Sequence, residues 1–242
     1  MVKMNEKVIL KLSAVVSAMA GVIILFTTLY PIVSYEADAG RKYPSLISPI
    51  GQKDTLSEAS TSVSTGLTGG IDYTDPSNWF VGTEYDLNTS PSLISHYTIS
   101  IPKLDIEDAI VEVGGKSLEK SLIQYPGTAS PGKAGNAVIF GHSILPQFYN
   151  PKNYLAVFSL LPTLDKGDSI QVKYDGVAYS YIVEDMFEVL PTDLQILDQQ
   201  PDSSYLTLVT CVPPGHPLKP KRLIVRARVA SYNQGLYIEN NL

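Results

Sequence analysis

Short apolar runs separated by turn residues fill the chain from residue 94 onward, and they limit its fold more than any other feature. Each run is rich in Val, Ile, Leu or Tyr and has the length of a single β-strand. Many short strands with frequent turns are typical of a closed or nearly closed β-barrel. The runs cover residues 97–99, 106–113, 137–140, 169–174, 178–189, 206–210 and 223–229.

Turn residues separate these runs, and helical patterns are scarce. Asp175-Gly176 lies between two runs rich in Val, Ile and Tyr, which predicts a tight β-hairpin. We expect only one or two short helices, near residues 117–123 and 153–161. The sequence therefore predicts a mainly β domain.

The N-terminus carries an uncharged apolar stretch over residues 12–30. As a helix rising about 1.5 Å per residue it would be about 28 Å long, close to the hydrocarbon thickness of a bilayer. Three lysines precede the stretch and acidic residues follow it, which favours a cytoplasmic N-terminus. We predict a single-pass transmembrane anchor over residues 1–34, with the rest of the chain outside. The lysines are Lys3, Lys7 and Lys11.

A cleaved signal peptide is the alternative interpretation of this stretch. Ala37-Asp38-Ala39 has the small-residue spacing of a cleavage site. The apolar segment of a signal peptide is shorter, at roughly 7 to 15 residues, so we favour the uncleaved anchor. Both interpretations place the remaining chain outside the cytoplasm.

Residues 35–91 are rich in Ser, Thr, Gly, Asp and Pro and lack helical or strand periodicity. Such a segment buries too little apolar surface to offset its ordering entropy, so we predict a flexible extracytoplasmic linker. Residues 73–80 differ from the rest because they contain the single Trp, Trp79, followed by Phe80. These two aromatic residues would dock this part of the linker onto the domain.

The composition of the chain disfavours one class of partner and excludes one kind of covalent cross-link. Lys plus Arg number 18 against 24 Asp plus Glu, giving a net charge of −6 and disfavouring nucleic acid as a partner. A hydrophobic content of 44% suffices for the core of one domain. With a single cysteine, an internal disulfide is excluded.

Three reactive side chains lie at the ends of predicted strands. Cys211 follows the run 206–210, His142 follows the run 137–140 after one glycine, and Arg222 begins the last run. Cys, His and Arg are the parts of a nucleophile, a general acid or base and an anion stabiliser. If the last two strands pair, Arg222 would lie beside Cys211. A buried, inert thiol is the alternative interpretation of a lone cysteine.

The residues around these three side chains resemble the sortases, the cysteine transpeptidases of bacterial cell envelopes. Thr207-Leu-Val-Thr-Cys211 is similar to the TLxTC signature of that family, and Asn136-Ala-Val-Ile-Phe-Gly-His142 to its segment ending in the catalytic His. Arg222 lies where the essential Arg is expected. The resemblance implies a closed eight-stranded β-barrel over residues 92–232, followed by a tail over residues 233–242.

The resemblance also implies a mechanism and its partners. Cys211 would attack an LPXTG-like sorting motif to form a thioacyl enzyme, and His142 and Arg222 would act as acid and oxyanion stabiliser. An amine of cell-wall peptide or of a pilin would then accept the acyl group. We expect Val209, Thr210 and Ser143 to contact the substrate. An exported cysteine endopeptidase of the same fold and a non-catalytic membrane-tethered binding barrel are the alternatives.

Pilus-assembling sortases carry a lid with an Asp-Pro-aromatic motif, and Asp75-Pro76 followed by Trp79 is similar to it. Here two residues separate the proline from the aromatic residue. We therefore hypothesise a lid over residues 73–80 that involves Asp75 and Trp79.

We predict no metal site or other cofactor, with calcium as the one open alternative. Some sortases bind calcium in a region comparable to Asp105, Glu107 and Asp108. Strand alternation would place Asp105 and Glu107 on one face and Asp108 on the other, which disfavours a shared ion.

Overall fold

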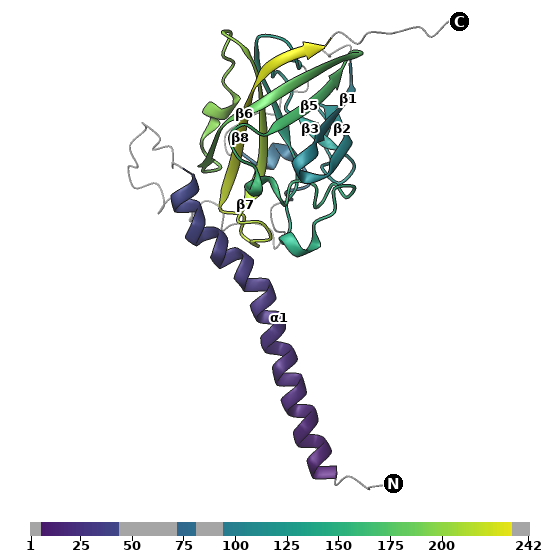
Figure 1. The fold of residues 1–242 in the computed structure, drawn as a ribbon, viewed down its shortest axis with the longest axis vertical. Coiled ribbons are helices and arrows are strands. Elements are labelled where there is room, and N and C mark those ends of the chain that lie inside the picture. The colour runs from purple at the N-terminus through teal and green to yellow at the C-terminus, as the bar shows by residue number, and fades with distance from the viewer. Residues whose placement is uncertain (1–5, 44–71, 81–93, 234–242) are drawn as a thin grey trace, which may run out of the picture.

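The computed structural model describes residues 6–43, 72–80 and 94–233. Residues 94–233 form a closed, eight-stranded barrel in the order β1-β2-β3-β4-β7-β8-β6-β5 (Figure 1). The strands are β1 (His96–Ile101), β2 (Ile106–Val113), β3 (Leu122–Gln124), β4 (Gly135–Phe140), β5 (Ser169–Tyr174), β6 (Val177–Val189), β7 (Ser204–Val212) and β8 (Lys221–Asn233). The predicted eight-stranded barrel is confirmed, and each of the predicted runs forms a strand.

The prediction of a short helix near residues 117–123 was wrong, because β3 begins at Leu122. This strand pairs in parallel with β2 and antiparallel with β4, and so closes the barrel between these two strands. All three of its residues are buried. A strand of this length shows no alternation in the sequence, and its pairing partners determine its structure.

Residues 153–161 also lack the predicted α-helix and instead form successive turns. Amide-to-carbonyl hydrogen bonds join residues three apart, such as Ala156 to Asn153 at 2.8 Å. The short helices in the described residues are 3-10 helices: η1 (Pro76–Asn78), η2 (Pro102–Leu104), η3 (Pro146–Phe148), η4 (Leu161–Thr163) and η5 (Leu194–Leu197). Four of these five contain a proline in the first turn, which favours such short segments.

Two apolar layers bury both faces of β4, β7 and β8. The inner layer fills the barrel and includes Leu208 and Val225. The second layer, here called the outer core, lies outside the barrel wall and includes Val209, Cys211 and Trp79. Alternation along β7 sends Leu208 inward and Val209 and Cys211 outward. Because both faces of β4 are covered, its residues 137–140 appear in the sequence as a continuous apolar run.

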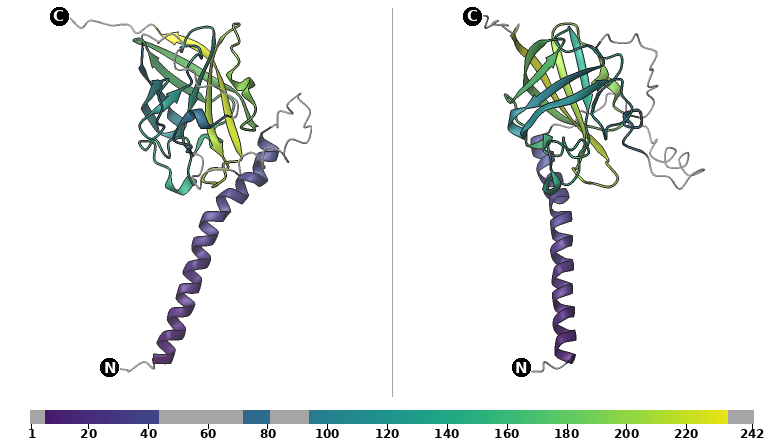
Figure 2. Two further views of the ribbon diagram at one scale, coloured as in Figure 1. Left: turned by 180° about the vertical axis from the view of Figure 1, so that it is seen from behind. Right: turned by 90° about the vertical axis from the view of Figure 1, so that its right-hand side faces the viewer.

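The N-terminal helix α1 (Glu6–Lys42) is longer than predicted. Its section Leu10–Lys42 is the one helix in the described residues that is long and apolar enough to cross a membrane, and a signal sequence has the same properties. Figure 2 shows that it extends away from the barrel over most of its length.

The helix continues through residues 35–42, which we had assigned to the linker. This section packs against the barrel: Ala39 and Tyr43 are buried, and Lys42 Nζ donates to the carbonyl of Pro162 at 2.8 Å. Tertiary contacts therefore extend the helix beyond the apolar stretch. The rest of the predicted linker, over residues 44–71 and 81–91, and the tail over residues 234–242 lie outside the described residues.

Gly141, at the end of β4, gives the first prediction. A Cβ there would lie 2.4 Å from Phe158 and 2.6 Å from Leu122. We expect Gly141→Ala to lower the free energy of unfolding by about 1–3 kcal/mol, because the surrounding core must shift. Chemical unfolding of the full chain in detergent measures this loss. Gly40→Ala is the control, since its Cβ meets nothing within 4 Å. Equal stabilities of Gly141→Ala and the unmodified chain would contradict the prediction.

Candidate active site

Strand pairing brings Cys211 and Arg222 together. β7 and β8 are antiparallel, and Cys211 lies directly opposite Arg222 in their register. Directly opposed residues in such a pair have Cβ atoms roughly 5 Å apart on the same face. The last two strands therefore pair, which is the condition under which we predicted Arg222 beside Cys211.

His142 reaches the same edge of the barrel because β4 runs parallel to β7. The chain continues beside β7 after β4 ends: the amide of Gly141 donates to Val209 O at 3.1 Å, and Ser143 Oγ donates to Cys211 O at 2.6 Å. Thr210 Oγ1 also donates to Gly141 O at 2.8 Å. These bonds hold His142 beside the end of the strand that carries Cys211.

Residues 72–80, here called the cover segment, lie over this edge. Asp75 caps η1, since its Oδ1 accepts hydrogen bonds from the amide and hydroxyl of Ser77 at 2.9 and 2.7 Å. Trp79 is fully buried, and its ring centroid lies 5.8 Å from that of His142. The guanidinium carbon of Arg222 lies 5.4 Å from the Trp79 ring. The predicted docking of Trp79 onto the domain thus occurs at the three reactive side chains.

Arg222 lies on the outer face of β8, and the cover segment buries it to 1% exposure. Its NH2 donates to Trp79 O at 3.1 Å and its NH1 to Lys219 O at 2.8 Å. Its Nε has no hydrogen-bond partner among the described residues. One donor of the guanidinium is therefore free to bind another acceptor at this edge.

Burial keeps the imidazole and the thiol neutral. It lowers the pKa of His142 to about 4, with a further contribution from Lys219, while Asp72 acts in the opposite direction. Burial also raises the pKa of the Cys211 thiol, against the attraction of Arg222 and Lys219 for the thiolate. His142 Nε2 is buried and lacks a hydrogen-bond partner within the described ranges. With the cover segment in place, the site holds neither a thiolate nor an imidazolium at neutral pH.

A pocket of about 340 Å³ opens beside His142, and the loop between β7 and β8 and the cover segment form its walls. His216 lines it as well. Tyr73 of the hypothesised lid lines it too, and so do Asp72 and Lys219, which sequence reasoning missed. The Lys219 Nζ lies 4.5 Å from the centroid of the Tyr73 ring, so this contact closes one side of the pocket. The aromatic ring of Tyr73 within a polar linker was the available signal for its docking.

The predicted substrate contacts at Val209, Thr210 and Ser143 stay predictions. Val209 packs in the outer core, and both hydroxyls donate to backbone carbonyls of the site. In this arrangement the three side chains support the strand ends.

The acidic residues considered for calcium are arranged differently from the prediction. Glu107 and Asp108 are both exposed, because the β1–β2 register shifts and Asp108 has φ 46°, which breaks the alternation. Asp108 instead pairs with Lys173 at 2.8 Å. In residues 6–43, 72–80 and 94–233, no three His, Cys, Asp or Glu side chains form a group suited to a metal ion.

A closed barrel with Cys, His and Arg at one edge has the architecture of a cysteine acyltransferase. A sequence profile of the sortase domain matches residues 99–230. The chain therefore belongs to the sortase family, whose members are cysteine transpeptidases. Comparison with curated proteins found no match.

Several solved structures of sortases are similar to this chain. A sortase D5 transpeptidase from Clostridium perfringens is 27% identical, with 57% of this chain and 79% of that one covered and a TM-score of 0.48. A lid mutant of sortase A from Corynebacterium diphtheriae is 28% identical, with 60% and 74% covered and a TM-score of 0.49. A pilus-related sortase C of Group B Streptococcus is 27% identical, with 58% and 70% covered and a TM-score of 0.49. The assignment to the family rests on the profile match.

The pKa of His142 gives the second prediction. The full chain is labelled at histidine Cε1, and the NMR signal that disappears in His142→Gln is assigned to His142. In the unmodified chain this signal should have the chemical shift of a neutral ring at pH 7. We expect the ring to become protonated only as the pH falls toward 4, since burial disfavours the imidazolium. Trp79→Ala should move this pKa upward toward 6.5, the ordinary value, because water enters the site. A His142 that titrates at or above 6.5 in the unmodified chain would contradict the prediction.

Proposed function

We propose that this chain is a membrane-anchored sortase that cleaves an LPXTG-like sorting motif through a Cys211 thioacyl intermediate and transfers the acyl group to an amine. The observation that carries the proposal is the register of β7 and β8, which sets Cys211 opposite Arg222. The parallel pairing of β4 with β7 adds His142 at the same edge.

In the proposed reaction, the Cys211 thiolate attacks the carbonyl carbon of the scissile peptide bond. Arg222 donates hydrogen bonds to the developing oxyanion, and its free Nε–H suits this role. The C–N bond breaks as His142, in its imidazolium form, donates a proton to the leaving amine. An incoming amine then attacks the thioester, neutral His142 takes up the proton that this amine loses, the C–S bond breaks, and Cys211 leaves as the thiolate.

The arrangement of the cover segment supports its role as a lid over this chemistry. Trp79 packs over the three reactive side chains, and its carbonyl accepts a hydrogen bond from Arg222 NH2. The thiol and imidazole are both neutral under it. Substrate therefore binds after the cover segment moves, which lets water stabilise the charged forms of both groups.

The topology of the proposed enzyme follows from α1. Lysines before the apolar span favour a cytoplasmic N-terminus, and this orientation puts the barrel outside the cell membrane. Its partners there are proteins with sorting motifs and an amine of cell-wall peptide or of a pilin.

The third prediction concerns the reaction itself. The full chain in detergent, given fluorescent LPXTG-like peptides and an amine, should form an amine-linked product, because the amine captures the thioester. Cys211→Ala should reduce this product at least about 10³-fold, as expected when a nucleophile is removed. Mass spectrometry of the products measures both outcomes.

The other outcomes separate the alternatives. Cleavage that depends on Cys211 but yields only the hydrolysed product, even at high amine concentration, would support the endopeptidase. No cleavage by the unmodified chain, together with a thiol that stays unreactive in Asp75→Ala and Trp79→Ala, would support the non-catalytic binding barrel.

The fourth prediction tests the lid. Asp75→Ala removes the cap of η1, a change that costs roughly 0.5–2 kcal/mol in helices, and should favour opening. We expect Cys211 to react with a small thiol reagent about tenfold faster, and faster still in Trp79→Ala, because opening limits access to the thiol. Stopped-flow labelling of the full chain measures the rate.

Phe187→Ala is the matched control for this test. Phe187 is a buried aromatic residue of the same outer core, but its ring packs on Arg226. It should leave the labelling rate within about twofold of the unmodified chain. If Asp75→Ala and Trp79→Ala also leave the rate unchanged, the lid hypothesis fails.

A further inference from the structure

The end of the barrel that carries the candidate site also faces α1. Two loops form this end, η3 with the residues around it and the 213–220 loop between β7 and β8 (Figure 1). They lie together, since a Cβ at Gly215 would come within 2.5 Å of Leu145. Each loop exposes a large apolar side chain: Phe148 is 61% exposed and Leu218 is 76% exposed. Exposed apolar residues at neighbouring loop tips mark a surface for a partner.

A hydrogen bond fixes the height of these loops along α1. Pro31 lies inside the helix and lacks the amide that would otherwise bond to Thr27 O. Gln147 Nε2 donates to that carbonyl at 3.1 Å. The side chain next to Phe148 thus satisfies the acceptor that the proline leaves free. In an apolar environment an unpaired carbonyl is costly, so this bond favours the barrel at this level of the helix.

The position of Thr27 places this contact within the apolar span. At about 1.5 Å per residue, the helix rises about 30 Å from Lys11 to Pro31, which equals the hydrocarbon thickness of a bilayer. With Lys11 at the inner boundary, the outer boundary lies near Pro31, and Thr27 lies about 6 Å inside it. The loop that carries Phe148 therefore reaches the level of the outer leaflet.

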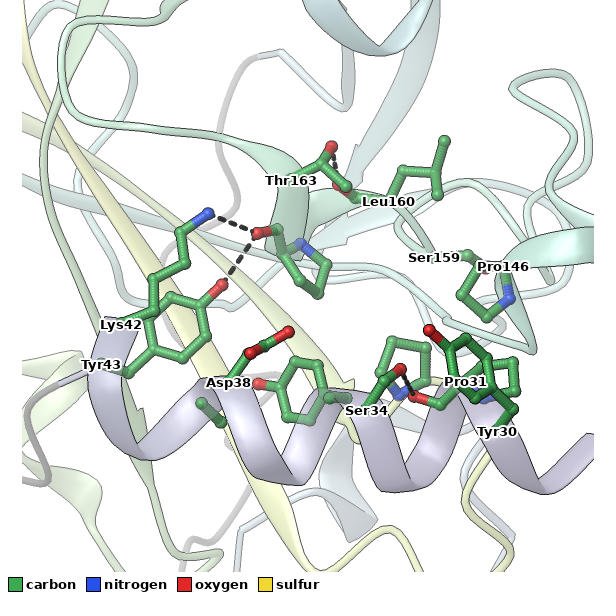
Figure 3. A pocket seen from close by; sticks show the side chains of 14 residues that line it. Tyr30, Pro31, Ser34, Asp38, Lys42, Tyr43, Pro146, Ser159, Leu160 and Thr163 are labelled. Atoms are coloured by element: carbon green, nitrogen blue, oxygen red, sulfur yellow. Dashed lines mark hydrogen bonds between the residues drawn. The ribbon is translucent and has the colours of Figure 1, made fainter.

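An apolar cavity continues this surface between α1 and the barrel. It has a volume of about 470 Å³ and lies between Tyr30 and Pro31 of the helix and Pro146, Leu160 and Pro214 of the barrel (Figure 3). Lys42 and Tyr43 close its far end through hydrogen bonds to Pro162 O, both of 2.8 Å. Its membrane-side end lies at Tyr30, where the apolar span ends, so the cavity adjoins the same leaflet.

We propose that this end of the barrel docks into the outer leaflet of the phospholipid bilayer, with Phe148 and Leu218 inserted among the lipids. The inference rests on the proposed membrane anchor and not on the proposed transpeptidation. A bilayer is the occupant that fits, because the surface is continuous with a membrane-spanning helix. Docking fixes the candidate site close to the membrane surface.

Spin labels in the full chain, reconstituted in phospholipid nanodiscs, test this proposal. Since Cys211 is the single cysteine, Cys211→Ala provides a background for Phe148→Cys and Leu218→Cys, one at a time. Electron paramagnetic resonance compares the collision of each label with oxygen, which enters lipid, and with a nickel chelate, which stays in water. Ala178→Cys is the control in water, because Ala178 is exposed and is the second residue of β6, at the opposite end of the barrel. Val22→Cys, within the apolar span, is the control in lipid.

We expect the ratio of oxygen to nickel accessibility at Phe148 and Leu218 to exceed that at Ala178 by about tenfold and to approach that at Val22. If either loop label matches Ala178 while Val22 is in lipid, the docking proposal fails and the anchor stands. If the Val22 label is also in water, the anchor and the docking proposal fail together. Neither result bears on transpeptidation, which the peptide assay measures separately.

Discussion

The antiparallel pairing of β7 with β8 is the constraint on which the rest of the site depends. It sets Cys211 opposite Arg222 through a backbone ladder that the inner core holds in register. A slip of one residue would turn Leu223 and Val225 out of the barrel and Arg222 into it. The register is therefore fixed by the burial of these apolar side chains, and the position of the guanidinium relative to the thiol follows from it.

The outer core is needed because β7 also carries apolar side chains on the face that points away from the barrel interior. A strand that is apolar on both faces needs a second layer, and the cover segment with Trp79 supplies part of it over Cys211. Burial of a thiol and an imidazole favours their neutral forms, so the layer that completes the core opposes the charged forms that the proposed chemistry requires. Stability of the closed barrel and reactivity of the thiol are thus in conflict, and the proposed movement of the cover segment would resolve this conflict.

Most of the barrel was predictable because its strands are long enough to show apolar runs between turn residues. β3 was not, since three residues carry no periodic signal and only their pairing with β2 and β4 defines them. Within the site, the sequence placed Cys211, His142 and Arg222 at strand ends. It did not indicate that Lys219 and Asp72 would face the pocket beside His142, because loop conformation decides this and no strand period applies there.

The extension of α1 beyond the apolar stretch was not predictable from the sequence either, because it too depends on tertiary contacts. Residues 35–42 have a mixed composition, and contacts far away in the sequence stabilise them as a helix. Lys221 joins Glu36 at 3.4 Å and Glu188 at 3.0 Å, and Tyr35 donates to Glu188 at 2.7 Å. Exposed ion pairs contribute little stability. The Glu188 side chain is only 11% exposed, so its contacts with Lys221 and Tyr35 also fix the orientation of α1 relative to the barrel.

Lys221 is the residue before Arg222, and its carbonyl accepts a hydrogen bond from Arg222 NH1 at 3.1 Å. The helix that anchors the chain is therefore joined to the first residue of the strand that carries the candidate oxyanion donor. Together with the bonds that Gln147 donates to Thr27 O and Lys42 donates to Pro162 O, this contact attaches the barrel to α1 at three separate levels of the helix. Several attachments restrict rotation of the barrel about the helix, whereas a flexible linker would permit it. The chain thus holds its reactive edge at a fixed height and orientation relative to α1.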